Sequence, residues 1–366
     1  MSEKKINILI AGGGTGGHLY PALAIADEIR KRRADANILF VGTRDKIEAR
    51  VVPERGYAFT TIWVSGFHRG MRMQNFLLPL KVVVSLFQSF FLIARYRPNV
   101  VLGTGGYVCA PVILAASLLR IPTVIHESNS YPGVTTRLLA GRATTVFTAF
   151  AATNLWLKRT ATVELVGTPT RASLDGVTTE SALGFFGLDA AKKTVFVFGG
   201  SLGAASINSA LLNIAETLKN QNVQLIWQTG LTDEARIKSA IGERNIGWIG
   251  SYIDRMELAY AAADIVVCRS GATTIAELTR IGKPAILVPF PHAAADHQTL
   301  NAKTLADVGA AVLVPDNELE QKLESAILEL LGDRARRASM SAASKSLGKP
   351  DAGSVIAAKI LDMMTA

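Results

Sequence analysis

The sequence predicts an α/β fold of two domains, each built on a doubly wound parallel sheet. Three observations support this prediction. The chain has 366 residues, which is long enough for two domains that each bury a core. Apolar strand-like runs alternate with helical patterns from one end to the other. A unit of strand, glycine turn and helix opens the chain and returns, in altered form, after residue 192.

The opening unit, residues 6–18, reads INILIAGGGTGGH. Its apolar first half is typical of a strand buried on both faces, and the apolar residues after His18 recur at helical spacing. The glycines between them allow positive φ and the close approach of another group. Because a helix N-terminus favours an anion, the turn indicates a phosphate site. Gly12, Gly14 and Gly17 also match the dinucleotide fingerprint G-x-G-x-x-G.

Basic residues are concentrated in the first half of the chain. Residues 1–166 carry a net charge of +11, whereas residues 167–366 carry a net charge of −2. This asymmetry indicates an anionic partner for the first half. The sequence lacks zinc-ligand spacings, RNP strings and basic stretches interleaved with aromatic residues, so we expect no nucleic acid. A membrane surface or a phosphorylated substrate fits better.

The N-terminus and the two cysteines indicate the compartment. The opening MSEKK, followed directly by a strand, lacks the form of a signal peptide, which predicts a cytoplasmic protein. Cys109 and Cys268 are far apart in the sequence, so we expect no disulfide framework. The hydrophobic fraction of 49% and the mean hydropathy of +0.27 are high for a soluble enzyme.

The second predicted strand, residues 37–43, ends in Gly42-Thr43-Arg44. A dinucleotide site normally has an acidic residue at this place to bind the ribose. The missing acid counts against a dinucleotide-dependent oxidoreductase, although Arg44 would suit NADP.

Residues 76–94 are almost uncharged and reach the length of a membrane span. We reject a span because Pro79 and Lys81 lie inside the stretch and strand–helix patterns continue on both sides. Two compatible interpretations remain: a helix packed on the sheet, and an interfacial helix whose outer face enters lipid. In the second interpretation, lipid headgroups are bound by Arg69, Arg72, Lys81, Arg95 and Arg97.

The next strands of the first half end in glycine or polar residues. A third strand ends in a second glycine turn, with Gly103, Gly105 and Gly106. The fourth strand delivers residues 126–129, His-Glu-Ser-Asn, at its carboxyl end, where open α/β sheets place their sites. The histidine and the glutamate are adjacent and point to opposite faces, so we expect no metal pair.

The second half repeats the plan of the first. The strand and glycine turn at 193–203 are followed by another strand, small-residue turn and helix around Gly271. We therefore expect domains at 1–166 and 167–366, with the last helix a candidate to pack back on the first domain. Two such domains facing each other would leave a cleft lined by the carboxyl ends of both sheets.

The motifs that are missing narrow the chemistry. The sequence contains no D-x-D, H-E-x-x-H, Cys/His cluster at metal spacing, P-loop or G-x-S-x-G, so we expect no metal. The glycine turns suit a nucleoside diphosphate leaving group stabilised by helix ends and an arginine. His18 starts a helix, which favours its neutral form, and it is either a general base on a sugar hydroxyl or a hydrogen-bonding neighbour. Glu277 either accepts from a ribose diol or pairs with solvent and the helix dipole.

Seven motifs occur in order along the chain: GGGTGGHLYPALAIA, VLGTGGYV, IHESN, GTPTR, FGGSLGAASIN, VCRSGATTIAEL and PFPHAAADHQTLNA. Together they resemble glycosyltransferase family 28, the GT-B N-acetylglucosaminyltransferases that convert lipid I to lipid II in peptidoglycan synthesis. The resemblance covers essentially the whole chain. It implies two Rossmann-like domains, inversion at the anomeric carbon, and no cofactor or required metal. It also implies that UDP-GlcNAc lies mainly on the second domain and lipid I on the first, at the cytoplasmic face of the cell membrane.

The resemblance also implies roles for individual residues. His18 matches the proposed base toward the C4 hydroxyl of the muramyl sugar, and Glu277 matches the ribose-binding glutamate. Arg171 and Ser201 match contacts to the diphosphate, and the Ile253 backbone matches the contact to uracil. The other positions that match donor contacts are Thr15, Gly16, Gly17, Asn129, Ala272, Thr273, Thr274 and Gln298. The positions that match the acceptor diphosphate loops are Gly13, Gly14, Gly103, Gly105, Gly106 and Tyr107.

The chain departs from the family at Ser128 and His297, where other members have glutamine. Beyond the two substrates, the resemblance implies an anionic membrane surface as a partner, and it makes proteins of cell-wall synthesis or division candidates.

Three other functions fit parts of the sequence. A UDP-GlcNAc 2-epimerase is also built from two Rossmann-like domains, but it needs no basic, lipid-facing half and no acceptor. A dinucleotide-dependent oxidoreductase rests on the fingerprint alone. A non-catalytic, membrane-bound nucleotide-sugar binder would keep its binding when His18 is replaced by alanine.

Overall fold

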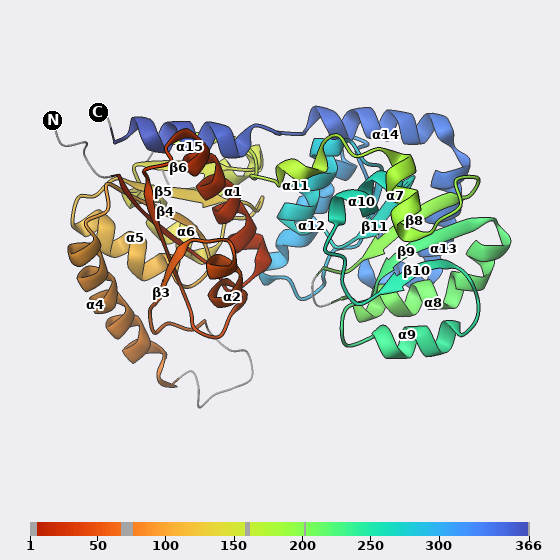
Figure 1. Ribbon diagram of the computed structural model, residues 1–366, viewed down its shortest axis with the longest axis horizontal. Helices are drawn as coiled ribbons and strands as arrows, with labels where there is room; N and C mark the ends of the chain where they lie inside the picture. Colours follow the sequence, from red (N-terminus) through yellow and green to blue (C-terminus); the bar gives the residue numbers. More distant parts are fainter. Residues whose placement is uncertain (1–5, 67–75, 158–161, 201–202, 365–366) are drawn as a thin grey trace. The chain divides into compact units, whose positions relative to one another are not determined.

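The structure is a computed structural model that describes residues 6–66, 76–157, 162–200 and 203–364. The chain divides into two compact units, Met1–Thr170 with Lys349–Ala366, and Arg171–Gly348 (Figure 1). The first stretch of the first unit ends at Thr170, where the sequence suggests 166. The C-terminal segment also belongs to the first unit, because its helix packs on the core of that unit, as described below.

The first unit is built on a seven-stranded sheet in the order β3-β2-β1-β4-β5-β6-β7, in which all neighbouring strands are parallel. The order reverses between β1 and β4, so the carboxyl ends of these strands lie side by side at a topological switch point. The strands are β1 (Asn7–Gly12), β2 (Asn37–Gly42), β3 (Ala58–Thr61), β4 (Val100–Gly105), β5 (Thr123–Glu127), β6 (Thr145–Thr148) and β7 (Thr162–Leu165). The α-helices are α1 (Gly16–Arg32), α2 (Ile47–Glu54), α4 (Leu78–Tyr96), α5 (Cys109–Leu118), α6 (Val134–Leu139) and α15 (Ala352–Asp362), and the 3-10 helices are η1 (Ala140–Arg142) and η2 (Ala151–Trp156).

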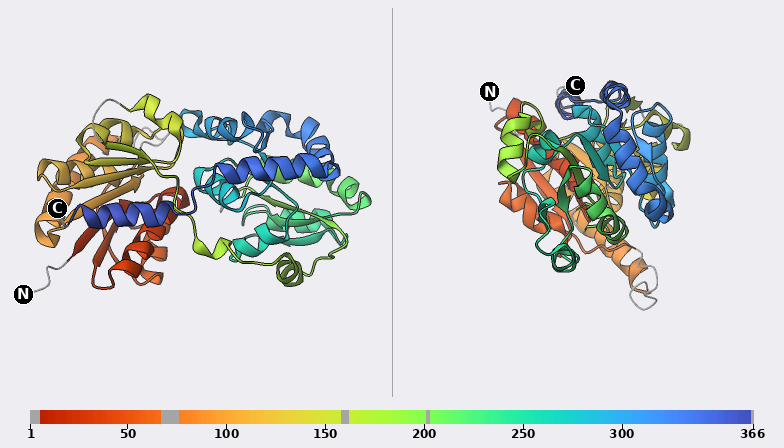
Figure 2. Two further views of the ribbon diagram at one scale, coloured as in Figure 1. Left: turned by 90° about the horizontal axis from the view of Figure 1, so that it is seen from above. Right: turned by 90° about the vertical axis from the view of Figure 1, so that its right-hand side faces the viewer.

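The first sheet has a hydrophobic core on each face. Ile8 and Ile10 of β1 pack with residues of α1 and α15, whereas Leu9 and Ala11 pack with residues of α5. Helix α15 lies beside α1 (Figure 2) and buries an apolar face that includes Ile356. Because this burial completes the core of the first sheet, the C-terminal helix belongs to the first unit.

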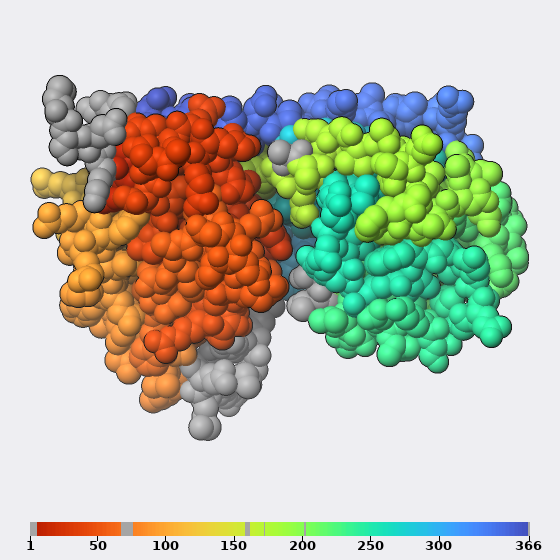
Figure 3. Space-filling view, viewed as in Figure 1, coloured from red at the N-terminus to blue at the C-terminus, as the bar shows by residue number. Residues whose placement is uncertain are grey.

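Helix α4 contains the nearly uncharged stretch of the sequence. It begins with Pro79 in its first turn, where a missing N–H leaves no helical hydrogen bond unmade. Ser85, Ser89 and Ile93 are buried where the helix packs on α5. Within the described part of the chain it is the one helix long and apolar enough to cross a membrane, and 17% of the window that meets this criterion is buried. Its outer side chains form part of the surface of the first unit (Figure 3, orange).

The second unit is built on a six-stranded sheet in the order β10-β9-β8-β11-β12-β13, again entirely parallel. Its switch point lies between β8 and β11. The strands are β8 (Lys193–Phe198), β9 (Val223–Gln228), β10 (Gly247–Gly250), β11 (Ile265–Cys268), β12 (Ala285–Leu287) and β13 (Val312–Leu313). The α-helices are α7 (Thr179–Phe186), α8 (Ala205–Asn220), α9 (Glu234–Ile241), α10 (Met256–Ala262), α11 (Ala272–Ile281), α12 (His297–Ala306), α13 (Leu319–Gly332) and α14 (Arg334–Ser346), and the 3-10 helices are η3 (Ala172–Leu174), η4 (Ala294–Asp296) and η5 (Asp316–Glu318). Two doubly wound parallel sheets confirm the predicted fold class.

Candidate functional site

The two glycine turns of the first unit meet at the switch point of its sheet. The turn after β1 contacts the turn after β4 so closely that a Cβ at Gly106 would overlap the carbonyl oxygen of Gly13. Gly106 also has a φ of +85°, which L side chains rarely adopt. Gly105 and Gly106 are half-buried, but Gly103 is buried inside β4, where an added Cβ would meet the Ile113 side chain at 3.0 Å. Gly103 therefore packs the helix on the sheet rather than forming part of the exposed turn.

His18 lies in the first turn of α1, next to the second glycine turn. Its Nδ1 is 3.2 Å from the carbonyl oxygen of Thr104, and the Thr104 hydroxyl donates to the His18 carbonyl at 2.9 Å. Because a carbonyl oxygen only accepts, the proton of the neutral ring is on Nδ1 and the lone pair is on Nε2. The preceding residues Thr15 and Gly17, which the sequence assigns to the donor, are exposed. This geometry gives His18 the tautomer that a general base needs.

Glu48 is a residue of this site that sequence reasoning missed. It lies in the first turn of α2, is fully buried, and reaches the turn after β1. One carboxylate oxygen accepts from the Gly14 N–H at 2.9 Å, and the other accepts from the Thr43 N–H at 3.1 Å and hydroxyl at 2.9 Å. The Gly14 N–H assigned to the acceptor diphosphate thus has a partner within the protein. Nothing in the sequence pattern marks Glu48 for this role.

The carboxyl end of β5 holds Asn129 in place. Glu127 accepts from the Asn129 N–H at 3.0 Å, from its side-chain amide at 3.2 Å and from the Thr136 hydroxyl at 2.6 Å. The neighbouring His126 is 2.9 Å from the Gly167 carbonyl, and burial lowers its pKa, which keeps the ring neutral. Both residues have structural partners. No group of three or more His, Cys, Asp or Glu that could hold a metal occurs in the ranges the structure covers.

In the second unit, the structure brings two predicted donor residues together. Glu277 on α11 accepts from Arg171 Nε at 2.9 Å through one oxygen and from the Tyr260 hydroxyl at 3.0 Å through the other. Burial raises the pKa of Glu277, while the Arg171 charge and the Tyr260 hydrogen bond oppose that shift. Sequence reasoning missed Tyr260, because an ordinary helical tyrosine carries no signal of this contact.

The N-terminus of α11 carries the predicted turn Ala272–Thr274. Gly271 is the N-cap residue, and no side chain caps the helix. The Thr273 hydroxyl is buried and finds no hydrogen-bond partner within the described ranges. A buried polar atom normally has a partner, and the first N–H groups of a helix have no acceptor within it, so this helix end is a candidate site for a ligand with acceptor oxygens.

The remaining predicted donor residues lie near the carboxyl ends of the second sheet. The Ile253 N–H donates to Gln228 Oε1 at 3.0 Å, and Gln228 also donates to the Gly200 carbonyl at 2.9 Å. Gln228, which sequence reasoning missed, thus joins the uracil-matching segment to the glycine turn after β8. Gln298 Oε1 accepts from the Phe290 N–H at 3.0 Å. Ser201 lies outside the described residues.

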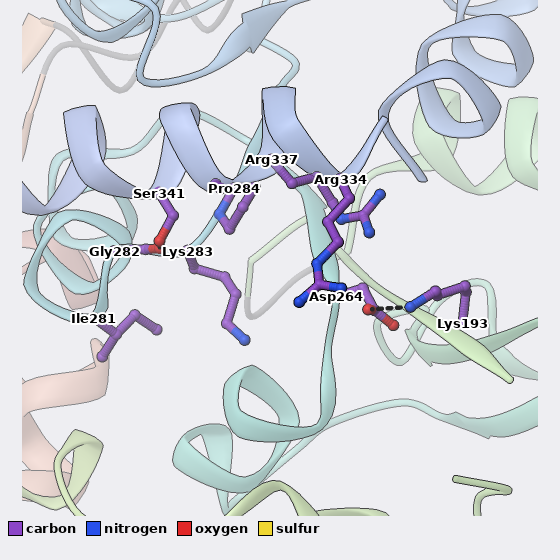
Figure 4. A pocket seen from close by; sticks show the side chains of 10 residues that line it. Lys193, Asp264, Ile281, Gly282, Lys283, Pro284, Arg334, Arg337 and Ser341 are labelled. Carbon is purple, nitrogen blue, oxygen red and sulfur yellow. Dashed lines mark hydrogen bonds and ion pairs between the residues drawn. The ribbon is translucent and has the colours of Figure 1, made fainter. Parts of the chain in front are cut away.

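A basic cavity of about 560 Å³ lies elsewhere in the second unit (Figure 4). Its lining includes Lys193, the first residue of β8, Asp264, which precedes β11, and Lys283, which lies two positions before β12. It therefore lies at the amino ends of the strands, whereas the predicted donor residues follow the carboxyl ends. Burial lowers the pKa of Lys283 to about 8, and its ammonium group donates to the Ala263 carbonyl at 2.6 Å. None of the predicted site residues lines this cavity.

Two solved structures similar in fold are only 14–16% identical to this chain. CalG4, a calicheamicin glycosyltransferase, has a TM-score of 0.71 and 16% identity, over 99% of both chains. The UDP-GlcNAc 2-epimerase of Neisseria meningitidis has a TM-score of 0.68 and 14% identity, over 98% of this chain and all of its own. These likenesses show the shared two-domain fold and do not separate a transferase from an epimerase.

Matches in sequence distinguish the transferase from the epimerase. The family models for the N-terminal and C-terminal domains of glycosyltransferase family 28 match residues 8–148 and 194–356. Proteins of Salinibacter ruber and Chlorobaculum tepidum, each 44% identical over 97–99% of both chains, carry the name UDP-N-acetylglucosamine–N-acetylmuramyl-(pentapeptide) pyrophosphoryl-undecaprenol N-acetylglucosamine transferase. The crystal structure of Acinetobacter baumannii MurG matches 98% of this chain with a TM-score of 0.74 and 28% identity. The chain therefore belongs to glycosyltransferase family 28, as an enzyme of the N-acetylglucosamine transferase type.

Proposed function

We propose that this enzyme transfers GlcNAc from UDP-GlcNAc to the C4 hydroxyl of MurNAc in undecaprenyl-pyrophosphoryl-MurNAc-pentapeptide. The products are lipid II and UDP, and the reaction inverts the anomeric carbon without a metal ion. The names of the relatives support this donor and acceptor. The observation that carries the proposal is the joining of Arg171, Glu277 and the open N-terminus of α11 in one unit.

The donor half of the proposal rests on charge and hydrogen-bonding capacity. Glu277 binds the ribose hydroxyls, since its side chain keeps 5% of its surface exposed and its oxygens have lone pairs beyond the two bonds observed. The Arg171 side chain, 35% exposed, and the first turn of α11 bind the diphosphate. Ser201, Ile253 and Gln298 complete the donor site by resemblance.

In the chemical step, His18 Nε2 removes the proton from the C4 hydroxyl as its oxygen attacks the anomeric carbon. Attack on the face opposite UDP forms the new glycosidic bond, and the bonding electron pair of the old one leaves with the UDP oxygen. Arg171 and the helix end stabilise the charge that develops on this leaving group. The acceptor diphosphate binds at the second glycine turn through Gly106 and Tyr107, with Gly13 and Gly105 beside them, since the Gly105 N–H donates to Cys109 Sγ at 3.1 Å. Thr15, Gly16, Gly17 and Asn129 stay assigned to the donor by resemblance.

The transfer assay tests this proposal. Labelled GlcNAc from UDP-GlcNAc is offered to a lipid I analogue in the presence of EDTA. We expect acceptor-dependent release of UDP and a labelled disaccharide lipid. Conversion of UDP-GlcNAc without acceptor would instead indicate an epimerase, and binding without turnover would indicate a nucleotide-sugar binder.

We also propose that the enzyme attaches peripherally to the cytoplasmic face of the membrane through α4. Phe87 and Phe91 are each 71% exposed on the outer side of this helix, and Arg95 and Arg97 lie at its C-terminal end. Arg69 and Arg72, the other expected headgroup contacts, lie outside the described residues. Replacement of both phenylalanines by serine should lower binding to anionic vesicles at least tenfold, whereas Leu231→Ser, at a 79% exposed leucine of the second unit, should not. Equal binding of the two variants would contradict the proposal.

A further inference from the structure

We propose that Tyr260 is a positioning residue for the donor: its hydroxyl holds the Glu277 carboxylate in the orientation in which it binds the ribose. This inference rests on the proposed function, because it takes Glu277 as the group that accepts from the ribose diol. Tyr260 itself touches neither substrate. It acts through Glu277 alone.

The ring of Tyr260 is fixed by its surroundings. Tyr260 lies on α10, is 1% exposed, and packs edge-on against Phe196 and Phe198 of β8, with ring centroids 5.4 Å and 6.0 Å away. The side chain therefore has one accessible orientation, and in it the hydroxyl is 3.0 Å from Oε2 of Glu277. A hydroxyl held this firmly defines a fixed point for the carboxylate.

The second partner of the Glu277 carboxylate, Arg171, is also proposed to bind the donor. Arg171 binds Oε1 of Glu277, but its side chain is 35% exposed and is also assigned to the UDP diphosphate. Water and the phosphate oxygens therefore compete with Glu277 for the Arg171 guanidinium group. The Tyr260 hydroxyl, buried and on a different element, stays in place throughout. It is therefore the anchor that keeps the carboxylate oriented for the incoming ribose.

The charges around Glu277 predict how the pH dependence of donor binding changes when the Tyr260 hydroxyl is lost. The titratable groups that face Glu277 are Arg171, Tyr260, Glu257 and Cys268. Burial and the Glu257 charge raise the pKa of Glu277, whereas Arg171 and the Tyr260 hydrogen bond lower it. The pKa of Tyr260 lies well above its ordinary value, chiefly because of burial, so its hydroxyl remains a donor at every working pH. Loss of the hydroxyl should then raise the pKa of Glu277 further.

The test compares two single-atom deletions. Tyr260→Phe removes the hydroxyl at Glu277, and Tyr57→Phe removes a matched hydroxyl in the first unit, where Tyr57 is 4% exposed and donates to Asp27 at 2.6 Å. We expect Y260F to raise the KM for UDP-GlcNAc roughly three- to tenfold, the range set by one hydrogen bond. The KM for the lipid I analogue should not change. The acid limb of kcat/KM for the donor should move to higher pH. Y57F should change none of these.

Two further variants make every outcome decisive. In a Glu277→Gln background, Tyr260→Phe should have little additional effect on the donor KM, because the carboxylate it positions is gone. An unchanged donor KM in Y260F, or a loss equal to that in Y57F, would overturn the inference. If E277Q itself left the donor KM unchanged, the ribose role of Glu277 in the proposed function would fail. A large effect of E277Q with none of Y260F would overturn only the role of Tyr260.

Discussion

Two buried carboxylates, Glu48 in the first unit and Glu277 in the second, lie beside the strand-end turns of two similar sheets and have opposite surroundings. Glu48 is fully buried, and its three hydrogen bonds come from neutral donors of Gly14 and Thr43. Glu277 keeps a small exposed edge, and its bonds come from a guanidinium group and a tyrosine hydroxyl. The Glu48 carboxylate occupies the space beside the turn after β1, whereas part of the Glu277 side chain stays accessible to a ligand.

This difference supports placing the proposed UDP-GlcNAc site in the second unit. In the first unit, a Cβ at Gly13 would overlap the Glu48 carboxylate, so the space beside the fingerprint turn already holds a negative charge. A phosphate oxygen therefore cannot accept from the Gly14 N–H, which already donates to this carboxylate. In the second unit, the Thr273 hydroxyl at the start of α11 has no hydrogen-bond partner among the described residues, and α11, like α1, has no side-chain cap. We therefore expect the nucleotide at the start of α11 rather than at the fingerprint turn.

The largest effect that we expect from a substitution in one unit only is on turnover. His18→Ala removes the proposed base from the first unit and leaves the second untouched. We expect kcat to fall about 10²- to 10⁴-fold, the usual contribution of general base catalysis, with the Kd for UDP unchanged. Steady-state kinetics with a lipid I analogue and calorimetric titration with UDP measure the two quantities. A pH–rate profile that kept its low-pH limb in H18A would rule out His18 as the base.

The next effect separates the two carboxylates directly. Glu277→Gln should raise the KM for UDP-GlcNAc about 10- to 100-fold, because hydrogen bonds to a charged group contribute about 1.5–3 kcal/mol each. Glu48→Gln should leave the Kd for UDP unchanged. Titration of both variants with UDP makes the comparison, and equal losses of UDP affinity would mean that the two carboxylates do not differ as proposed.

Glu48→Gln should act on the first turn instead. The glutamine amide turns an N–H toward either Gly14 or Thr43, so one part-buried backbone donor loses its acceptor. We expect the free energy of unfolding to fall by about 1–3 kcal/mol and the KM for the acceptor to rise. Denaturant unfolding and acceptor titration check this. Glu54→Gln, at the exposed end of the same helix, is the control and should change neither quantity.

The sequence was sufficient for the fold and for the residues that belong to contiguous motifs. Glycine turns after apolar strands are local patterns, and they predicted two domains with parallel sheets. The family resemblance assigned Arg171 and Glu277 to the donor, and the structure joins their side chains. Glu48 and Tyr260 could not be predicted in this way. Glu48 lies 34 positions from Gly14, and Tyr260 lies 17 positions from Glu277, so their contacts depend on how separate elements pack.

Two further departures have the same cause. Gly103 looks like part of a loop in the sequence, but in β4 it allows Ile113 of α5 to approach the sheet. The predicted assignment of the Gly14 N–H to a phosphate failed to anticipate a carboxylate arriving from α2. In both cases the glycine turn was recognised correctly, and a side chain from another helix gave one of its glycines a structural role.

The smallest expected effect is on stability, and it tests whether the Thr43 hydroxyl helps to hold Glu48. Thr43→Val replaces one hydroxyl by a methyl group of similar size and removes the 2.9 Å bond to Glu48, while the Thr43 N–H still donates. We expect the free energy of unfolding to fall by about 1 kcal/mol, since one neutral donor is lost and the carboxylate keeps two others. Thr43→Ser keeps the hydroxyl and should recover most of that loss. If the valine and serine variants unfold alike, the hydroxyl does not stabilise Glu48, and the backbone alone holds the carboxylate that closes the first turn.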